Sequence, residues 1–519
     1  MKRQNLTSHL TNGSGIKNDY RKGLLLMLAC RSQSYQLWET IIRAGTLLPR
    51  FLAQPRNLNC THHSRCVCQS KVKDFMRNLS VRAVFALLLV SLAPASWADI
   101  PALLGSGNIS VSETGSVAAA KYAILSRTRS RLCRFNVYPN DYYQGGDTSP
   151  ELLDEAMLQA QRSGITPVLL FEHDDNTHPV GDYHKWYAIG WQFANRFRPN
   201  SPWWQQHGVT NFGVTLYQAF NEPDIVAYRQ PNLKLDLNEY HDAMQGLADG
   251  VHAVQASLKV VPGGYGTPNA YGTVVGYGAM GYGRALQDLF NNGALDGVNI
   301  HTYFHNRWAP LVGTYTNSAQ YKFDQFKQVA GITRDINFYC AEYNYSRRIS
   351  DDPVIYEQDS VLGERFLTGL WDVLGVVHAD GKSATRAALV WGLIDTESAF
   401  DKYGFSEQLN PWIPSARGQV YELVTRLTQG LNFTSLDPKR SGVYVLSGTN
   451  KKLWVWQDRA AWTNKPGTSF TLTNIPVNTT RIEVYGWDGL RKTVSVAATE
   501  RSKTISVPGN ETYMFLAVK

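Results

Sequence analysis

The sequence predicts an α/β protein: a (β/α)8 barrel followed by a small antiparallel β-sandwich. From about residue 100 to 430, short apolar strands alternate with amphipathic helical stretches, and strands that are apolar throughout indicate parallel pairing. Beyond residue 433 the pattern changes to short alternating strands with turn residues between them, which is typical of a β-sandwich. The 519 residues suffice for one large domain and one smaller domain.

The strands and helices of the barrel follow one another in a regular order. Ser149 and Pro150 open a helix that we expect to reach Ser163, because serine is a good N-cap and proline fits the first turn. Further helices are predicted around Tyr183–Phe197 and over 416–431. A first strand near Gly105–Val111 is weakly patterned, and seven others are clear: 133–139, 166–175, 214–220, 258–266, 297–304, 336–344 and 387–395.

Each of the two predicted domains leaves an alternative open. An open doubly wound sheet would also alternate strands with helices, but no glycine-rich phosphate loop follows the first strand. The β-sandwich, which we place at 433–519, could bind sugar or could simply support the barrel at 99–432. We favour support of the barrel over sugar binding.

Residues 76–98 have the parts of a signal peptide in the right order. Met76 is followed by two arginines, by an apolar run over 83–92, and by Ser96-Trp97-Ala98 as a cleavage site. The run is too short to cross a membrane. Translation from Met76 would make residues 1–75 a mis-assigned extension. The mature protein would then be periplasmic or secreted, without stable insertion in the membrane.

The leader accounts for the positive charge of the chain. Residues 1–98 hold 14 of the 51 Lys and Arg and 3 of the 43 Asp and Glu, which leaves 37 basic and 40 acidic residues and a charge of −3. The basic total is therefore no indication of a nucleic-acid partner.

The leader, residues 1–98, has two other interpretations. Residues 76–98 could be a buried helix, and GLLLMLAC at 23–30 could be a lipoprotein signal. The Cys- and His-rich stretch at 60–68 could bind metal, but it belongs to this leader, so we expect no metal and no cofactor in the mature protein.

Polar side chains stand at the ends of most barrel strands, where the active site of such a barrel lies. The fourth strand ends in Asn221 and Glu222 and is stopped by Pro223. His301 and Tyr303 on the sixth strand are two residues apart and so share a face. The remaining strand-end residues are Arg134 on the second strand, His173 on the third, Glu342 on the seventh and Trp391 on the eighth.

Two glutamates facing each other across a barrel mouth are suited to glycoside hydrolysis. One carboxyl group must be protonated to release the leaving oxygen, and the other must be ionised to attack the anomeric carbon. We expect Arg134 and Tyr303 to hold Glu342 as a carboxylate, and Glu222 to keep its proton beside that negative charge. Asn221 would donate to a sugar 2-hydroxyl, and Pro223 would fix the turn that presents both side chains.

This ordered set resembles glycoside hydrolase clan A over roughly residues 105–430. The clan has an Asn-Glu acid/base after the fourth strand, a glutamate nucleophile on the seventh, and Arg, His, His-x-Tyr and Trp on the second, third, sixth and eighth. Here the matching segments are RFNVY, FEHDD, FNEPD, IHTYF, CAEYN and LVWGL. The barrel with a short β-sandwich and the NEPD motif is most similar to family 39, with families 5 and 30 as alternatives.

The resemblance implies a retaining, double-displacement glycosidase. Glu222 would be the acid/base and Glu342 the nucleophile. The residues implied in substrate binding are Asn221, Arg134, His173, His301, Tyr303 and Trp391.

The barrel also bears on the two cysteines of the mature chain. By strand alternation Cys340 shares the inward face of Glu342, whereas Cys133 alternates with Arg134 and faces the helices. Their strands, the seventh and the second, are not neighbours. We therefore expect no disulfide and treat both residues as small buried hydrophobes.

The loops are rich in aromatic residues, which stack against the apolar faces of sugars. A Gly/Tyr-rich segment over 263–283 could form a mobile wall of a cleft. These features favour an endo-acting enzyme on a polysaccharide, with a bacterial exopolysaccharide as the first candidate. An exo-acting enzyme of the same clan on oligosaccharides, similar to a β-xylosidase, and a barrel that binds glycan without cutting it are the alternatives. The aromatic candidates are Tyr183, Trp186, Trp203, Trp204, Trp308, Tyr343, Tyr345, Phe400 and Tyr403.

Overall fold

The structure is a computed structural model. It describes residues 99–107, 109–172, 182–230, 232, 234–266, 278–304, 318–351, 353–397, 402–436, 442–457, 469–508 and 511–519. These ranges belong to one compact unit, Ser96–Lys519. The predicted signal peptide, His173, Trp308, Phe400 and residues 267–277 lie outside them. None of the helices in these ranges combines the length and apolar character that crossing a membrane requires.

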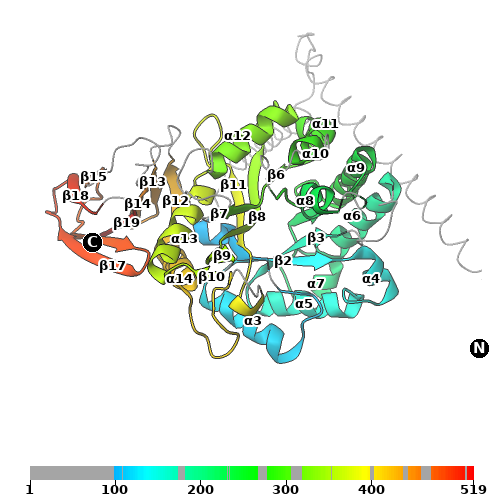
Figure 1. The fold of residues 1–519 in the computed structure, drawn as a ribbon, viewed down its shortest axis with the longest axis horizontal. Coiled ribbons are helices and arrows are strands. Elements are labelled where there is room, and N and C mark those ends of the chain that lie inside the picture. Colours follow the sequence, from blue (N-terminus) through cyan, green and yellow to red (C-terminus); the bar gives the residue numbers. More distant parts are fainter. Residues whose placement is uncertain are drawn as a thin grey trace, which may run out of the picture. The chain divides into compact units, whose positions relative to one another are not determined.

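The larger part of the unit is a curled parallel sheet with eight strand positions, as predicted (Figure 1). Its strand order is β5-β4-β3-β2-β1-β11-β8-β6, and β7 continues β6 along β8. Tyr265 N donates to Asn299 O at 3.1 Å and His301 N to Tyr265 O at 2.9 Å, which joins the β5 end of this order to the β6 end. The arrangement is consistent with a (β/α)8 barrel. Its strands are β1 (Leu104–Ser106), β2 (Leu132–Val137), β3 (Thr166–Phe171), β4 (Leu216–Ala219), β5 (Lys259–Pro262), β6 (Gly297–Asn299), β7 (Thr302–Phe304), β8 (Asn337–Tyr345) and β11 (Thr385–Val390).

Helices follow the parallel strands and surround them (Figure 1). The Ser149 side chain accepts from Leu152 N and caps its helix, as predicted. The second predicted helix has the expected bounds. The α-helices are α3 (Gly115–Arg127), α4 (Pro139–Gln144), α5 (Pro150–Arg162), α6 (Tyr183–Phe197), α7 (Pro202–Gln206), α8 (Pro223–Arg229), α9 (Leu237–Val254), α10 (Ala279–Ala285), α11 (Gln287–Asn292), α12 (Ala319–Ala330), α13 (Asp359–Leu374) and α14 (Ala416–Thr428); η1 (Ile100–Leu103) and η4 (Asp395–Glu397) are 3-10 turns.

Strand β8 carries a β-bulge beside the predicted nucleophile. Cys340 and Tyr343 pair with Ala388 and Val390 of β11, so β8 has one more residue than its partner there. The opposite neighbour shows the same excess, because Asn299 pairs with Tyr339 and Thr302 with Tyr343. An extra residue inverts the alternation of faces along a strand. Side chains before and after the bulge therefore do not keep one parity.

The bulge corrects the prediction for Cys340. Tyr339 packs inside the sheet with Val168 and Leu216, so its neighbour Cys340 faces the helices, where Lys322 of α12 influences its thiol. The expectation that Cys340 shares the inward face of Glu342 is therefore wrong, because simple alternation does not hold across the bulge. Cys133 and Cys340 are both buried and free.

The C-terminal residues form antiparallel sheets, as predicted. Six strands lie in the order β12-β13-β14-β19-β16-β17, and β15 pairs with β18. Trp454 and Phe515 of the larger sheet share an apolar cluster with Leu472 and Ile505 of the smaller one. A complete β-sandwich and the boundary at 432/433 stay predictions. The strands are β12 (Asn432–Ser435), β13 (Val443–Ser447), β14 (Lys452–Gln457), β15 (Ser469–Thr473), β16 (Arg481–Gly486), β17 (Gly489–Ser495), β18 (Ser502–Ser506) and β19 (Thr512–Val518); the hairpin β9 (Arg348–Asp351) and β10 (Val354–Tyr356) was not predicted.

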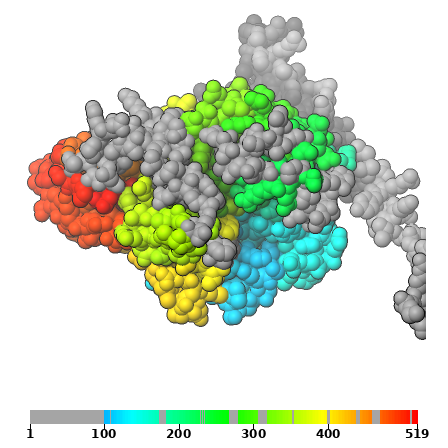
Figure 2. Space-filling view, in the orientation of Figure 1, coloured from blue at the N-terminus to red at the C-terminus, as the bar shows by residue number. Residues whose placement is uncertain are grey.

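Helix α13 packs closely against the C-terminal strands, and its yellow-green surface adjoins their orange and red surface in Figure 2. Thr512 N donates to Glu364 Oε1 at 2.8 Å, and Gly363 lies so close to Trp487 that an added Cβ would be 2.2 Å from the ring. Burial raises the pKa of Glu364 to about 8. Glu364 is therefore largely protonated at neutral pH and holds the packed surfaces together as a neutral group.

Candidate active site

Four strands bring their polar residues together at one end of the parallel sheet. Arg134 Nη2 donates to Glu342 Oε1 at 2.6 Å, and the Tyr303 hydroxyl donates to Glu342 Oε2 at 2.6 Å. His301 Nδ1 is hydrogen-bonded to Glu222 Oε1 at 2.8 Å and lies 3.5 Å from Glu342 Oε2. Five of the residues predicted from strand ends thus form one connected cluster.

The chain turns sharply at Glu222. Its φ of 45° and ψ of 52° lie in the left-handed region, which non-glycine residues rarely adopt and which is often found at functional sites. Glu222 N donates to Gly264 O at 2.9 Å, and Pro223 begins helix α8 directly after it. The proline fits the first helical turn because that turn needs no backbone N–H there. The strand therefore ends by aiming the Glu222 carboxyl group at the cluster.

The two oxygens of Glu342 are both occupied by donors. Burial alone would raise the pKa of Glu342, but the charges of His301 and Arg134, with hydrogen bonds from Tyr303 and Arg134, hold it below the ordinary value for a glutamate. Burial also works against a charged imidazole, yet Glu342 and Glu222 raise the pKa of His301. Glu342 is therefore a carboxylate at neutral pH.

The two glutamates differ in access to solvent and lie close together. The Glu222 side chain is 24% exposed and that of Glu342 is 8% exposed. Their nearest-placed carboxylate oxygens, together with a nitrogen of His301, lie within 4.8 Å of one another. Glu222 is thus the member of the pair that a leaving group and a water molecule could reach more easily.

Glu222, His301 and Glu342 also have the spacing of a metal site. The chemistry of the neighbours fits a cation poorly, because the Arg134 guanidinium is bonded directly to Glu342 and would face the metal charge. Both oxygens of Glu342 already accept short hydrogen bonds. We therefore describe the cluster as a paired-carboxylate site.

Gly264, which has no side chain, leaves the space that the His301 ring occupies. Gly264 has a φ of +120°, and a Cβ at this position would lie 2.0 Å from His301 Nε2. Any side chain at 264 would therefore push the imidazole away from the two glutamates. The sequence shows this glycine in a Gly/Tyr-rich run, but only the structure shows what it touches.

We expect Gly264→Ala to destabilise the protein more than Gly489→Ala does. Gly489 has the same φ of +120° with no atom within 4 Å of a Cβ, so both variants carry backbone strain of about 1–3 kcal/mol. Only Gly264→Ala also overpacks its surroundings, which typically costs about another 1–3 kcal/mol of stability. Urea unfolding measures the difference. Equal losses in the two variants would show that the His301 ring is not confined by residue 264.

The Arg134–Glu342 pair predicts a pH-dependent stability. A glutamate whose pKa is lowered by folding stabilises the protein above its unfolded pKa, and this contribution is lost as the pH falls through the folded pKa. The free energy of unfolding of the wild type should thus exceed that of Glu342→Gln most at neutral pH. The difference should shrink below about pH 4.5. Urea titrations between pH 7 and 3 measure it, and a constant difference would contradict a charged Glu342.

The other predicted binding residues that the structure describes, Asn221 and Trp391, make different contacts. Asn221 N donates to Glu172 Oε2 at 3.3 Å, and the Asn221 side chain is half-buried. Trp391 is half-buried, and its ring lies 5.4 Å from that of Tyr403 at 82°. The sugar contacts of Asn221 and Trp391 stay predictions, as does the role of His173, which lies outside the described residues.

Most of the aromatic residues proposed to stack on sugars belong to the apolar core. Trp186, Trp204, Tyr343 and Tyr345 are fully buried among helices and strands, and Trp203 is 8% exposed. Trp203 and Trp204 instead pack together on the short helix α7, with ring centroids 4.5 Å apart. The aromatic argument for a long cleft is weaker than the sequence suggested.

Sequence reasoning missed Glu172 at the end of β3. Its carboxylate accepts from Asn136 Nδ2 at 3.1 Å and from Asn221 N at 3.3 Å. It thus ties the second, third and fourth strands together just before Glu222. Its place directly before His173 in FEHDD could have indicated it, because both residues stand at the strand end.

Several glycoside hydrolases of known structure share this fold. A family 39 β-xylosidase from Caulobacter crescentus has a TM-score of 0.51 and 13% identity over 82% of this chain and 98% of its own. A family 51 α-L-arabinofuranosidase from Bifidobacterium longum has a TM-score of 0.51 and 13% identity over 82% and 97%. A glucosidase from Croceicoccus marinus has a TM-score of 0.52 and 12% identity over 80% and 96%.

No protein-family model matches the chain, and no curated protein does so either. The fold is thus similar to that of glycoside hydrolases, family 39 among them, in agreement with the resemblance of the strand-end motifs. This is a likeness of fold, and the chemistry has to be argued from the site.

Proposed function

We propose that the protein is a retaining glycosidase. The observation that carries this proposal is the pair Glu222 and Glu342, with carboxylate oxygens within 4.8 Å and Glu342 bonded by both Arg134 and Tyr303. Retaining enzymes place their carboxyl groups about 5–5.5 Å apart, whereas inverting enzymes need about 6.5–9.5 Å to admit a water molecule. The nearest oxygens of Glu222 and Glu342, within 4.8 Å of each other, and the resemblance of the strand-end motifs to a retaining clan together support this class.

In the first step Glu342 attacks the anomeric carbon while Glu222 protonates the departing glycosidic oxygen. The glycosyl group becomes an ester of Glu342, and the leaving sugar takes the proton. The hydrogen bond between His301 Nδ1 and Glu222 Oε1 fixes the orientation of this carboxyl group. In the second step Glu222, now a carboxylate, removes a proton from water, and the resulting attack releases Glu342.

For the substrate we propose a polysaccharide cut internally, with a bacterial exopolysaccharide as the first candidate. Support comes from the strand-end motifs and from the predicted export of residues 99–519 into the periplasm or the medium. An exo-acting enzyme on oligosaccharides is the second candidate, because most of the aromatic residues that suggested a long cleft belong to the apolar core.

Product size distinguishes these possibilities. Purified residues 99–519 are incubated with bacterial exopolysaccharides and plant β-glycans, with Glu342→Gln as the control. We expect oligosaccharides from one polymer with the wild type only. Monosaccharides alone would indicate exo action, and retention of a polymer by both proteins without products would indicate a binding protein.

A further inference from the structure

The Tyr403 ring packs against two residues of the proposed active site, Tyr303 and Trp391. Its ring centroid is 5.6 Å from that of Tyr303, which donates to the nucleophile Glu342, and 5.4 Å from that of Trp391. The Tyr403 side chain is 7% exposed, so it supports its neighbours more than it meets solvent. The ring therefore limits how far Tyr303 can turn away from Glu342.

The backbone at Tyr403 is held in place from both sides. Asn344, two residues after Glu342, donates from Nδ2 to Tyr403 O at 3.0 Å and also to Trp391 O. Gly392 has a φ of +99°, and a Cβ there would lie 2.9 Å from Tyr403 Cβ. The Asn344 amide thus joins β8, which carries the nucleophile, to the end of β11 and to the loop of Tyr403. Gly392 allows their close approach.

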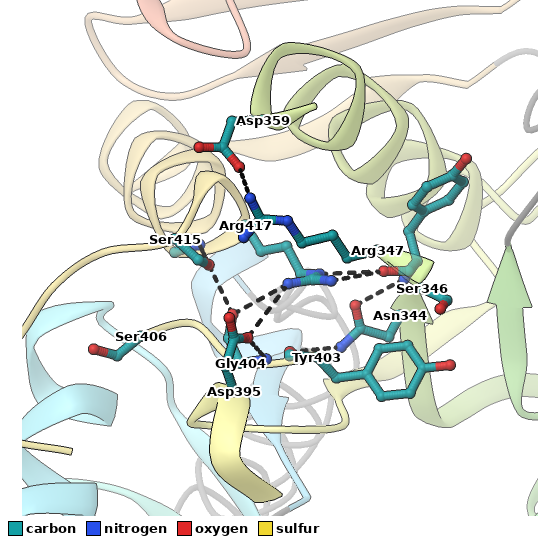
Figure 3. Close-up of polar contacts among 12 residues, drawn as sticks. Asn344, Ser346, Arg347, Asp359, Asp395, Tyr403, Gly404, Ser406, Ser415 and Arg417 are labelled. Atoms are coloured by element: carbon teal, nitrogen blue, oxygen red, sulfur yellow. Dashed lines mark hydrogen bonds and ion pairs between the residues drawn. The ribbon is translucent and has the colours of Figure 1, made fainter. Parts of the chain in front are cut away.

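Arg417 of α14 completes the attachment, as Figure 3 shows with Asp395, Gly404 and Ser415 around it. Its Nε and Nη2 donate to Tyr345 O at 3.2 and 3.1 Å, and its Nη1 donates to Gly404 O at 3.5 Å. The side chain is completely buried. Burial lowers the pKa of Arg417 to about 10, so it stays charged at neutral pH.

Asp395 binds the same loop from the other direction. Its Oδ1 accepts from Gly404 N at 2.8 Å and lies 3.8 Å from Arg417 Nη1, which gives the buried guanidinium a counter-charge. A planar guanidinium spreads its donors over three nitrogens and can join two carbonyls and a carboxylate at once, whereas a lysine ammonium carries its three donors on a single nitrogen. The loop carrying Tyr403 is therefore anchored by geometry that arginine alone supplies.

We propose that Tyr403 is a positioning residue for the nucleophile, acting through Tyr303, and that Arg417 sets the position of Tyr403. The inference rests on the proposed function and adds to it a residue outside the catalytic strands. With Tyr403 removed, Tyr303 gains freedom, and its hydrogen bond to Glu342 weakens. Arg134, His301 and Glu222, the charged or titratable groups that also face Glu342, keep their places.

The test compares Tyr403→Leu with Tyr403→Phe on an activated aryl glycoside. In Tyr403→Leu we expect kcat/KM to fall by about 10- to 100-fold, which is the scale of an active-site displacement of about 1 Å. The acid limb of its pH profile should move to higher pH, because Glu342 loses part of the bond that favours its carboxylate. Tyr403→Phe keeps the ring and should retain the wild-type acid limb.

Tyr122→Leu is the matched control. Tyr122 is a buried tyrosine on α3, and its hydroxyl donates to Ala156 O of α5 at 3.1 Å, on two helices that carry no residue of the proposed site. It should lower stability without moving the acid limb. Arg417→Met should shift the limb in the same direction as Tyr403→Leu, with Arg417→Lys shifted less. An unmoved acid limb in folded Tyr403→Leu would overturn the proposal.

A titration without substrate separates this inference from the proposed function. Protein labelled with [5-13C]glutamate gives a carboxyl signal for Glu342, assigned by its loss in Glu342→Gln. If the wild type hydrolyses no glycoside, the proposed function fails, yet the pKa of Glu342 still reports on Tyr403. An upward shift in Tyr403→Leu supports positioning, and an unchanged pKa overturns it.

Discussion

Replacing Glu342 by glutamine is expected to lower kcat by roughly 10⁵- to 10⁶-fold, the usual effect of removing a catalytic nucleophile. The amide retains the size of the side chain and one acceptor oxygen, so Arg134 and Tyr303 keep a hydrogen-bonding partner. It has no negative charge to attack the anomeric carbon, and no glycosyl ester forms. Hydrolysis of an activated aryl glycoside measures the loss.

Glu364→Gln provides the matched control for this substitution. Glu364 is a half-buried glutamate on α13 against β19, and its raised pKa of about 8 makes it largely neutral before the change. We expect full activity in Glu364→Gln. Near-normal activity in Glu342→Gln would refute the assignment of the nucleophile, whereas equal losses in both variants would point to a general effect on folding.

Replacing Glu222 by alanine is expected to slow substrates with poor leaving groups by about 10³- to 10⁴-fold, in the range of general acid catalysis. Activated aryl glycosides need little protonation of the departing oxygen, so their first step should change far less. The substitution also removes the partner of His301 Nδ1, but Glu342 remains 3.5 Å away as a counter-charge. The measurement is kcat/KM across aryl glycosides of graded leaving-group pKa.

The shape of that series decides the role of Glu222. A steep dependence on leaving-group pKa in Glu222→Ala, against a shallow one in the wild type, identifies the acid. Asn136→Ala provides a comparison. Asn136 donates a hydrogen bond to Glu172 near the site, but an amide cannot act as a general acid. If both variants lose activity equally on all leaving groups, Glu222 is not the acid.

The sequence was sufficient for the parallel strands, the helices between them and most of the site. Apolar strands followed by amphipathic helices have few stable arrangements, and parallel strands all end on one side of their sheet. The strand-end residues Arg134, Glu222, His301, Tyr303 and Glu342 therefore had to meet once the strand order was right. Local periodicity carries this information, because each strand end can be recognised without knowing its neighbours.

Other features depended on contacts that periodicity does not record. The bulge in β8 changes which way Cys340 points, and it arises from pairing with two neighbouring strands at once. The clearance between Gly264 and His301 and the bonds from Arg417 to Tyr345 and Gly404 join segments far apart in the chain. Such pairings follow from how the packed elements meet in space. A residue type and its spacing indicate that a side chain is available, but only the folded chain decides which partner it meets.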